Sequence, residues 1–231
     1  MTAESASYAP KTFFGRRKGH HGLTDARLDE FEKNLPAFAL PPDFDGDMEK
    51  VFGFAPTRAS LEIGYGSGEH LLELAGKRPR EAFLGAEAYL DGNVAIVRRL
   101  AESPLANVRI FPDDANLLLP RLRDKSFDEV FILYPDPWPK NRHEDRRMVS
   151  PARVREIARI LKPGGALLVA TDHPVYVAHT LRVMADSGLF AWTARASADF
   201  TRPPPGWTST RYEQKAVKEN RTPIYLQFSR I

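Results

Sequence analysis

Apolar residues along the chain fall into short runs that alternate with stripes of helical period. The runs at 60–63, 82–86, 108–111, 126–133 and 166–170 have the length of buried strands. Between them, apolar positions three and four residues apart predict helices around 71–75, 93–101 and 150–161. Strands separated by helices in this way indicate a parallel sheet covered by crossover helices.

The flanking segments extend this pattern. Helices are predicted at 25–35, 47–52 and 176–185, and strands at 190–193 and 224–228. Prolines at 36–42 and 203–205 favour loops, and the Lys-Pro-Gly-Gly sequence at 162–165 predicts a turn before the fifth strand. Residues 1–22 are polar, basic and without periodicity, so we expect a mobile arm followed by a single domain at 23–231.

Three glycines, Gly64, Gly66 and Gly68, separate the first predicted strand from its helix. Glycine adopts positive φ easily and lets a ligand approach bare backbone, while the helix that follows directs unpaired N–H groups toward that ligand. The spacing is neither the G-x-G-x-x-G of dinucleotide-binding folds nor the P-loop. A nucleotide-like cofactor is the expected ligand.

Acidic residues follow two of the predicted strands. Glu87 ends the second strand, where an acid in dinucleotide folds accepts hydrogen bonds from ribose hydroxyls. Asp136 follows the fourth strand and is bracketed by Pro135 and Pro137, which restrict its backbone. Because ligands of open α/β sheets bind beyond the carboxyl ends of the strands, we expect Asp136 to face a substrate.

Composition narrows the possible classes of protein. The 231 residues, 42% of them hydrophobic, suit one α/β domain with extensions. The sequence contains no cysteine, so disulfides and thiolate metal sites are excluded, and its six histidines lack metal-ligand spacing. We therefore expect no metal, and without a signal peptide or a membrane-length apolar segment we expect a cytoplasmic protein that does not contact membranes.

The net charge is only +3, but the basic residues are clustered. One group lies near the amino terminus around Arg16, Arg17 and Lys18, a second spans 140–147, and a third spans 202–221. Each group alone is explained by an ordinary solvated surface. Three groups around a cofactor-binding fold favour nucleic acid as the partner.

Several motifs together resemble one family. The segments LEIGYGSGEH, FLGAE, DDA, YPDPWPKNRHEDRR, LKPGG, TDH and TRYE occur in the order found in bacterial tRNA (guanine-N7)-methyltransferases, the TrmB family. The resemblance spans 13–228, and YPDPWPK followed by R-H-x-x-R-R is its most specific part. It implies a class I S-adenosylmethionine (SAM)-dependent methyltransferase with a Rossmann-like, doubly wound α/β fold: a mostly parallel seven-stranded sheet with helices on both faces.

The resemblance also implies roles for individual residues. The cofactor SAM would be bound by Glu62, Gly64, Gly66, Gly68, Glu87, Asp114, Ala115 and Asp136, of which Asp136 would also be catalytic. The substrate nucleotide would be contacted by Lys140, Asp172, Thr210, Arg211, Tyr212 and Glu213. The partner tRNA would be contacted by Arg142, His143, Arg146 and Arg147 and by the arm residues Arg16, Arg17 and Lys18. A monomer or weak homodimer is expected.

The implied reaction transfers the methyl group of SAM to N7 of a guanosine in the tRNA variable loop. Guanine N7 already exposes a lone pair, so no base is needed, and a carboxylate can both accept from the N1 and N2 donors of guanine and stabilise positive charge. Which of Asp136, Asp172 and Glu213 meets the base stays open. Methylation of an exocyclic amine is the main alternative; a nicotinamide oxidoreductase or a noncatalytic RNA-binding protein leaves Glu62 and PDPWPK unexplained.

Overall fold

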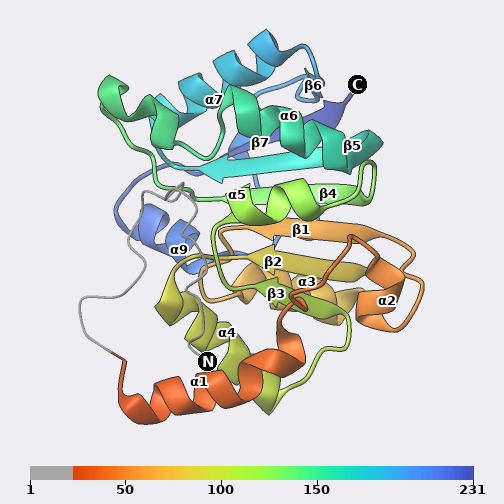
Figure 1. The fold of residues 1–231 in the computed structure, drawn as a ribbon. Helices are drawn as coiled ribbons and strands as arrows, with labels where there is room; N and C mark the ends of the chain where they lie inside the picture. The colour runs from red at the N-terminus through yellow and green to blue at the C-terminus, as the bar shows by residue number, and fades with distance from the viewer. Residues whose placement is uncertain (1–22) are drawn as a thin grey trace.

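A seven-stranded sheet organises residues 23–231, the part of the chain that the computed structural model describes (Figure 1). Its strand order is β3-β2-β1-β4-β5-β7-β6. The strands that pair in parallel are β1 (Ala59–Ile63), β2 (Ala82–Ala86), β3 (Val108–Phe111), β4 (Phe127–Leu133) and β5 (Leu161–Thr171). The antiparallel strands are β6 (Phe190–Trp192) and β7 (Ile224–Arg230). The predicted doubly wound, mostly parallel sheet is confirmed.

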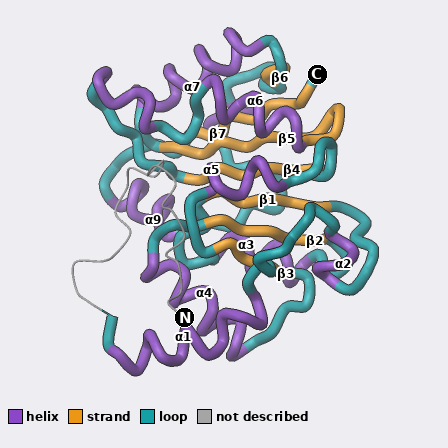
Figure 2. Tube along the Cα trace, viewed as in Figure 1, coloured by secondary structure: helices purple, strands orange, loops and turns teal. Residues whose placement is uncertain are grey.

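Helices cover both faces of the sheet (Figure 2). One face packs against α3 (Glu69–Lys77), α4 (Leu90–Glu102) and, outside them, α1 (Asp25–Phe38). The other face packs against α5 (Ala115–Leu118), α6 (Pro151–Ile160) and α7 (Pro174–Ser187). The remaining helical segments are α2 (Met48–Phe52), α8 (Ala198–Thr201), α9 (Arg211–Lys218) and the 3₁₀ turns η1 (Leu119–Arg121) and η2 (Asn141–Arg146).

Alternation along the central strand β1 decides which side chains enter which layer. Leu61 and Ile63 belong to the core on the face that α5, α6 and α7 cover, and Leu61 is fully buried between its neighbours Leu84 and Val130. Glu62 therefore points to the opposite face, where α3 lies. Truncation of Leu61 to alanine would cost about 2–5 kcal/mol of stability, because the close-packed neighbours cannot fill the space.

Two predicted boundaries were wrong. The first helix was expected to end before Pro36 but continues to Phe38, which packs with the α3–α4 layer and compensates for the backbone hydrogen bond that proline cannot make. The expected turn at 162–165 is an irregularity inside β5: Leu161 already pairs with Phe127, and the register then shifts before Ala166 pairs with Glu129.

Candidate active site

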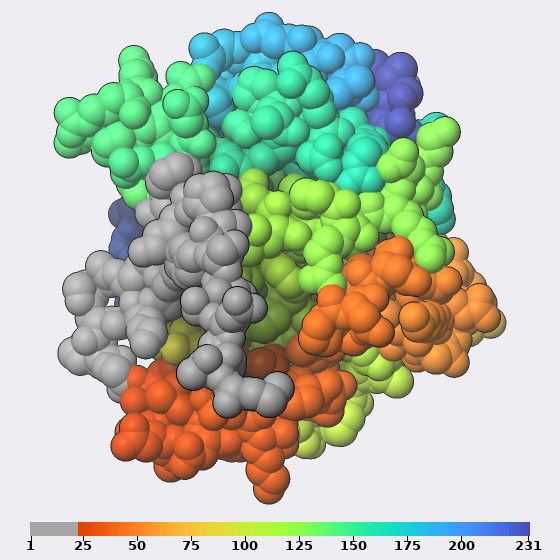
Figure 3. Space-filling model, viewed as in Figure 1, coloured from red at the N-terminus to blue at the C-terminus, as the bar shows by residue number. Residues whose placement is uncertain are grey.

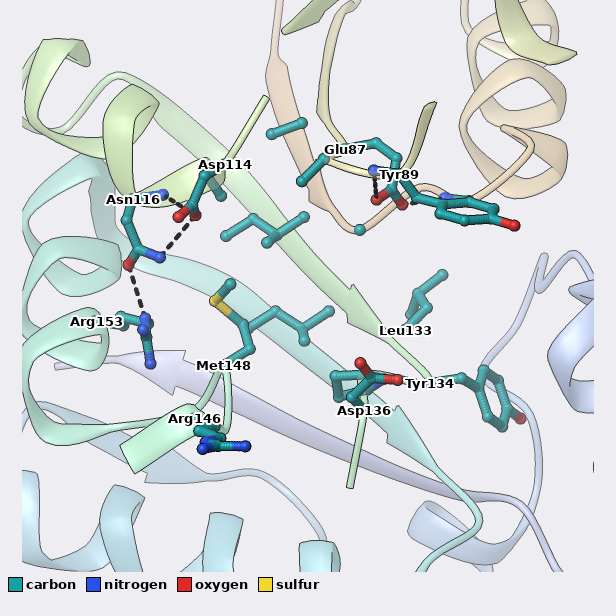
Figure 4. Close-up of a pocket in the computed structure, with 18 of the residues that line it drawn as sticks. Glu87, Tyr89, Asp114, Asn116, Leu133, Tyr134, Asp136, Arg146, Met148 and Arg153 are labelled. Carbon is teal, nitrogen blue, oxygen red and sulfur yellow. Dashed lines mark hydrogen bonds between the residues drawn. The ribbon is translucent and has the colours of Figure 1, made fainter. Parts of the chain in front are cut away.

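A cavity of about 540 Å³ opens at the carboxyl ends of the parallel strands. Its lining includes Gly64 and Gly66 after β1, Glu87 after β2, Asp114 after β3 and Asp136 after β4. This is the edge where ligands of doubly wound sheets bind, near the switch in strand order between β1 and β4. The structure thus brings residues from four separate predicted motifs around one space (Figure 4).

The glycine turn presents bare backbone to this cavity. Gly64, Gly66 and Gly68 have φ values of 78°, 58° and 79°, which side-chain-bearing residues rarely adopt. The turn is supported from behind by Gly92 of α4, where an added Cβ would lie 2.3 Å from the carbonyl oxygen of Gly66. Gly68 precedes α3 and lies outside the cavity lining.

The carboxylate of Glu87 is held by two backbone N–H groups that border the cavity. Its Oε2 accepts a hydrogen bond from the Gly66 N–H at 2.9 Å, and its Oε1 accepts one from the Tyr89 N–H at 2.8 Å. Burial nevertheless raises the pKa of Glu87, because the loss of hydration outweighs these backbone bonds. Each carboxylate oxygen keeps a second lone pair that a ligand hydroxyl can use.

Asp114 caps α5 and forms the far end of the cavity. Its Oδ1 accepts from the Asn116 N–H at 2.9 Å and from Asn116 Nδ2 at 2.7 Å. The Asn116 Oδ1 in turn accepts from Arg153 Nε of α6 at 2.7 Å, and Arg153 Nη1 donates to the carbonyl of Arg147. Asn116 and Arg153 were not predicted from the sequence, because neither belongs to a recognised motif. A polar residue on a helix does not by itself reveal which neighbour its side chain faces.

Asp136 lies in a loop whose backbone is strained at both ends. Tyr134 and Trp138 have φ values of 50° and 39°, in the left-handed region that non-glycine residues seldom occupy. Although Asp136 is exposed, the cavity walls remove part of its hydration, and this raises the pKa of its carboxyl group. Strain of this kind persists only where surrounding contacts hold the backbone in place.

Arg147 supplies those contacts. Its side chain is only 3% exposed, and its guanidinium donates to the carbonyl oxygens of Pro137, at 3.2 Å, and Trp138, at 3.0 Å. We had expected Arg147 on the RNA-contacting face. The structure corrects this expectation, because the side chain is turned into the protein and anchors the Asp136 loop.

The other basic residues of the second cluster are accessible. Lys140 and Arg142 are exposed, and the η2 segment projects from the body in the green region of Figure 3. Arg146 lines the cavity and places its guanidinium carbon 4.9 Å from the centre of the Trp138 ring. His143 meets the same ring edge-on at 5.5 Å. Arg16, Arg17 and Lys18 lie outside the described residues.

Two predicted acids are engaged within the protein instead of lining the cavity. Glu62 is buried and bonds to His70 Nδ1 of α3 at 2.7 Å, beneath the glycine turn. Asp172 forms an ion pair with Arg221. Neither residue is among those that line the cavity.

The segment at 210–213 divides into cavity-facing and inward residues. Arg211 and Tyr212 line the cavity, and Ala115 does so from the other side. Thr210 caps α9 by accepting from the Glu213 N–H at 3.1 Å. Glu213 is buried, and its carboxylate accepts from the Trp207 indole N–H at 2.6 Å and from the Tyr225 hydroxyl. Trp207 and Tyr225 were missed by the sequence analysis, because both lie outside the recognised motifs.

Residues 23–231 contain neither a metal-binding cluster nor a membrane-spanning helix. No group of three or more His, Asp or Glu side chains there is arranged to hold a metal ion. None of the helices in that part of the chain combines the length and the apolar character needed to cross a membrane.

Comparison with known proteins identifies the family. A family model described as "Putative methyltransferase" matches residues 57–226. The tRNA (guanine-N(7)-)-methyltransferase of Rhizobium johnstonii is 40% identical over 99% of this chain and 98% of its own. The protein of the same name from Azorhizobium caulinodans is 41% identical over the full length of both chains. The chain belongs to the tRNA (guanine-N(7)-)-methyltransferase family.

Solved structures agree with this assignment at the level of the fold. TrmN from Thermus thermophilus has a TM-score of 0.55 at 17% identity and is covered over 52% of its length, with 87% of this chain. The 16S rRNA methyltransferase KamB has a TM-score of 0.53 at 15% identity, with 91% of this chain and 95% of that one covered. The expected class I methyltransferase fold is therefore confirmed. The relatives of 40% and 41% identity confirm the resemblance drawn from the sequence motifs.

Proposed function

We propose that the protein transfers the methyl group of SAM to N7 of a guanosine in the variable loop of tRNA. The observation that carries this proposal is the convergence of Glu87, Asp114 and Asp136 on one cavity beside the glycine turn. It occurs in a chain about 40% identical, along its whole length, to tRNA (guanine-N(7)-)-methyltransferases.

The residues present fit SAM. At Gly64 an added Cβ would meet no atom within 4 Å, so the backbone there borders open space that the amino-acid end of the cofactor can fill. Glu87 offers two carboxylate oxygens to the ribose hydroxyls. Asp114 would accept from the adenine amino group, and Met148 offers apolar surface between Asp114 and Asp136 (Figure 4). When bound, SAM supplies an activated methyl group on a sulfonium sulfur.

The protein's contribution to the reaction is placement and charge. Guanine N7 needs no deprotonation, so Asp136 is not required as a base; its carboxylate accepts from the N–H groups of guanine and stabilises the positive charge that the purine gains. The strained loop and its bonds to Arg147 hold the backbone that carries this carboxylate before the substrate arrives. Holding the two reactants in line is worth roughly 7–11 kcal/mol of the barrier in well-oriented reactions.

Product mapping tests the proposal. Purified protein is incubated with methyl-labelled SAM and unmodified tRNA, and the nucleosides are separated after digestion. We expect label in 7-methylguanosine from the variable loop. Label in an N-methylated exocyclic amine would instead support the alternative reaction, and the absence of transfer to any RNA would contradict the proposal.

A further inference from the structure

Helix α9 carries a continuous basic stripe. Arg211, Lys215 and Lys218 are spaced by four and three residues, so they lie along one side of the helix, and all three are exposed. The acid of this helix, Glu213, is buried against Trp207 and Tyr225 and contributes no charge to that side. The charged side chains that α9 exposes are therefore all positive.

The stripe begins at the cavity. Arg211 lines it from α9, and Arg146, which follows the exposed Lys140 and Arg142, lines it from the η2 segment. Basic residues thus stand on two separate walls of the same opening. An RNA strand that delivered a base to Asp136 would pass between these walls, and its phosphates on both sides of that base would meet positive charge.

Helix stability does not explain the whole stripe. Lys215 and Lys218 lie in the last turn, where cations interact favourably with the helix dipole. Arg211 is the first residue of the same helix, where a cation is unfavourable. Because Arg211 also lines the cavity, an anionic ligand bound there would offset this unfavourable charge.

We propose that the Arg211–Lys215–Lys218 stripe is a second RNA-binding surface, which contacts the sugar–phosphate backbone of the substrate across the cavity from η2. The inference rests on the proposed function for the identity of the RNA as tRNA. It predicts that α9 contributes affinity without reading the sequence, because phosphates carry no base information.

The test uses the full chain with Lys215→Gln and Lys218→Gln combined. Glutamine has the helix propensity of lysine, so the change removes charge while α9 is retained. The matched control combines Lys50→Gln and Lys77→Gln, two exposed lysines on α2 and at the end of α3, near the amino ends of the strands (Figure 1). Dissociation constants for unmodified tRNA are measured at several salt concentrations, and SAM affinity is measured by calorimetry.

We expect the slope of log affinity against log salt to become shallower by about 1.4–1.8 in the α9 variant, as for two lost phosphate contacts, and to be unchanged in the control. The KM for tRNA should rise, while SAM affinity matches wild type. A slope equal to that of wild type would overturn the inference even if wild-type protein forms 7-methylguanosine. Wild-type protein that binds tRNA but does not methylate it would contradict the proposed function, and the slope would still decide the role of α9.

Discussion

The indole N–H of Trp207 donates to Oε2 of Glu213 at 2.6 Å, and this bond ties α9 to the layer beneath the glycine turn. The Trp207 ring also packs against His70 at 5.1 Å, and His70 bonds to Glu62 at the end of β1. Tyr225 of β7 donates to the other oxygen of Glu213. Through these contacts the helix that carries Arg211 and Tyr212 is held in place over the cavity.

Glu213 should therefore act by positioning α9 and not by reading guanine. Glu213→Gln keeps one acceptor for Trp207 and can donate to Tyr225, so most activity should remain. Glu213→Ala leaves two buried donors unpaired and should cost about 1–3 kcal/mol for each, measured by urea denaturation.

A substrate analogue separates positioning from base reading. Inosine lacks the N2 donor of guanosine, so a residue that reads guanine sets the preference between tRNAs that carry one or the other. The ratio of kcat/KM for the two tRNAs should be the same in Glu213→Gln, Tyr225→Phe and wild type. Loss of that preference in Glu213→Gln alone would show that the carboxylate meets the base.

Gly92 should control SAM affinity from outside the cavity. In Gly92→Ala the new methyl group would lie 2.3 Å from the Gly66 carbonyl, so the glycine turn must shift. We expect SAM affinity, measured by calorimetry, to fall at least tenfold. Gly76→Ala is the matched control, because its Cβ meets no atom within 4 Å and alanine favours the helix by about 1 kcal/mol. Equal SAM affinity in both variants would contradict this role.

Substitution of Arg147 should lower the stability of the protein, whereas substitution of Lys140 should weaken tRNA binding. Arg147→Ala removes the donors to Pro137 and Trp138, so it should lower stability by about 2 kcal/mol or more and reduce turnover. Lys140→Ala, an exposed change, should leave stability intact and make the salt dependence of tRNA binding shallower by about 0.7–0.9. Denaturation and salt titration of both variants check this; the reverse pattern would place Arg147 on the RNA face after all.

The contrast between Arg147 and Lys140 illustrates which features of the site can be predicted from the sequence and which cannot. The strands, the glycine turn and the acids Glu87 and Asp136 were predictable, because periodicity and chain order place them at one edge of a sheet. The inward direction of Arg147 and Glu213 was not. Each lies in a run of charged residues within a 3₁₀-containing loop or a short helix, and its partners are carbonyls or aromatic groups that no local pattern identifies.

The same reasoning explains the turn wrongly expected before β5. Lys162-Pro163-Gly164-Gly165 has the composition of a loop, and Gly164 does adopt a positive φ of 76°. The pairing of Leu161 with Phe127 nevertheless extends the strand across it. Tertiary pairing with β4 outweighed local propensity.

Activity should rise with pH through the ionisation of Asp136. Reduced hydration raises its pKa above the usual 3.8, and the protonated carboxyl group lacks the charge that stabilises the methylated purine. With SAM and tRNA saturating, kcat should therefore fall on acidification at a higher pH than an ordinary aspartate would give. Asp136→Asn should lower kcat by about 100-fold or more while the protein stays folded, and its residual rate should lack this acidic limb. An unchanged kcat in Asp136→Asn would exclude the catalytic role.

The most direct measurement for the whole account is a crystal structure of the protein soaked with S-adenosylhomocysteine, the demethylated product. We predict density in the cavity, with the ribose against Glu87, the adenine against Asp114 and the sulfur facing Asp136 across the glycine turn. Density bound elsewhere on the protein, with this cavity empty, would contradict the assignment of the site.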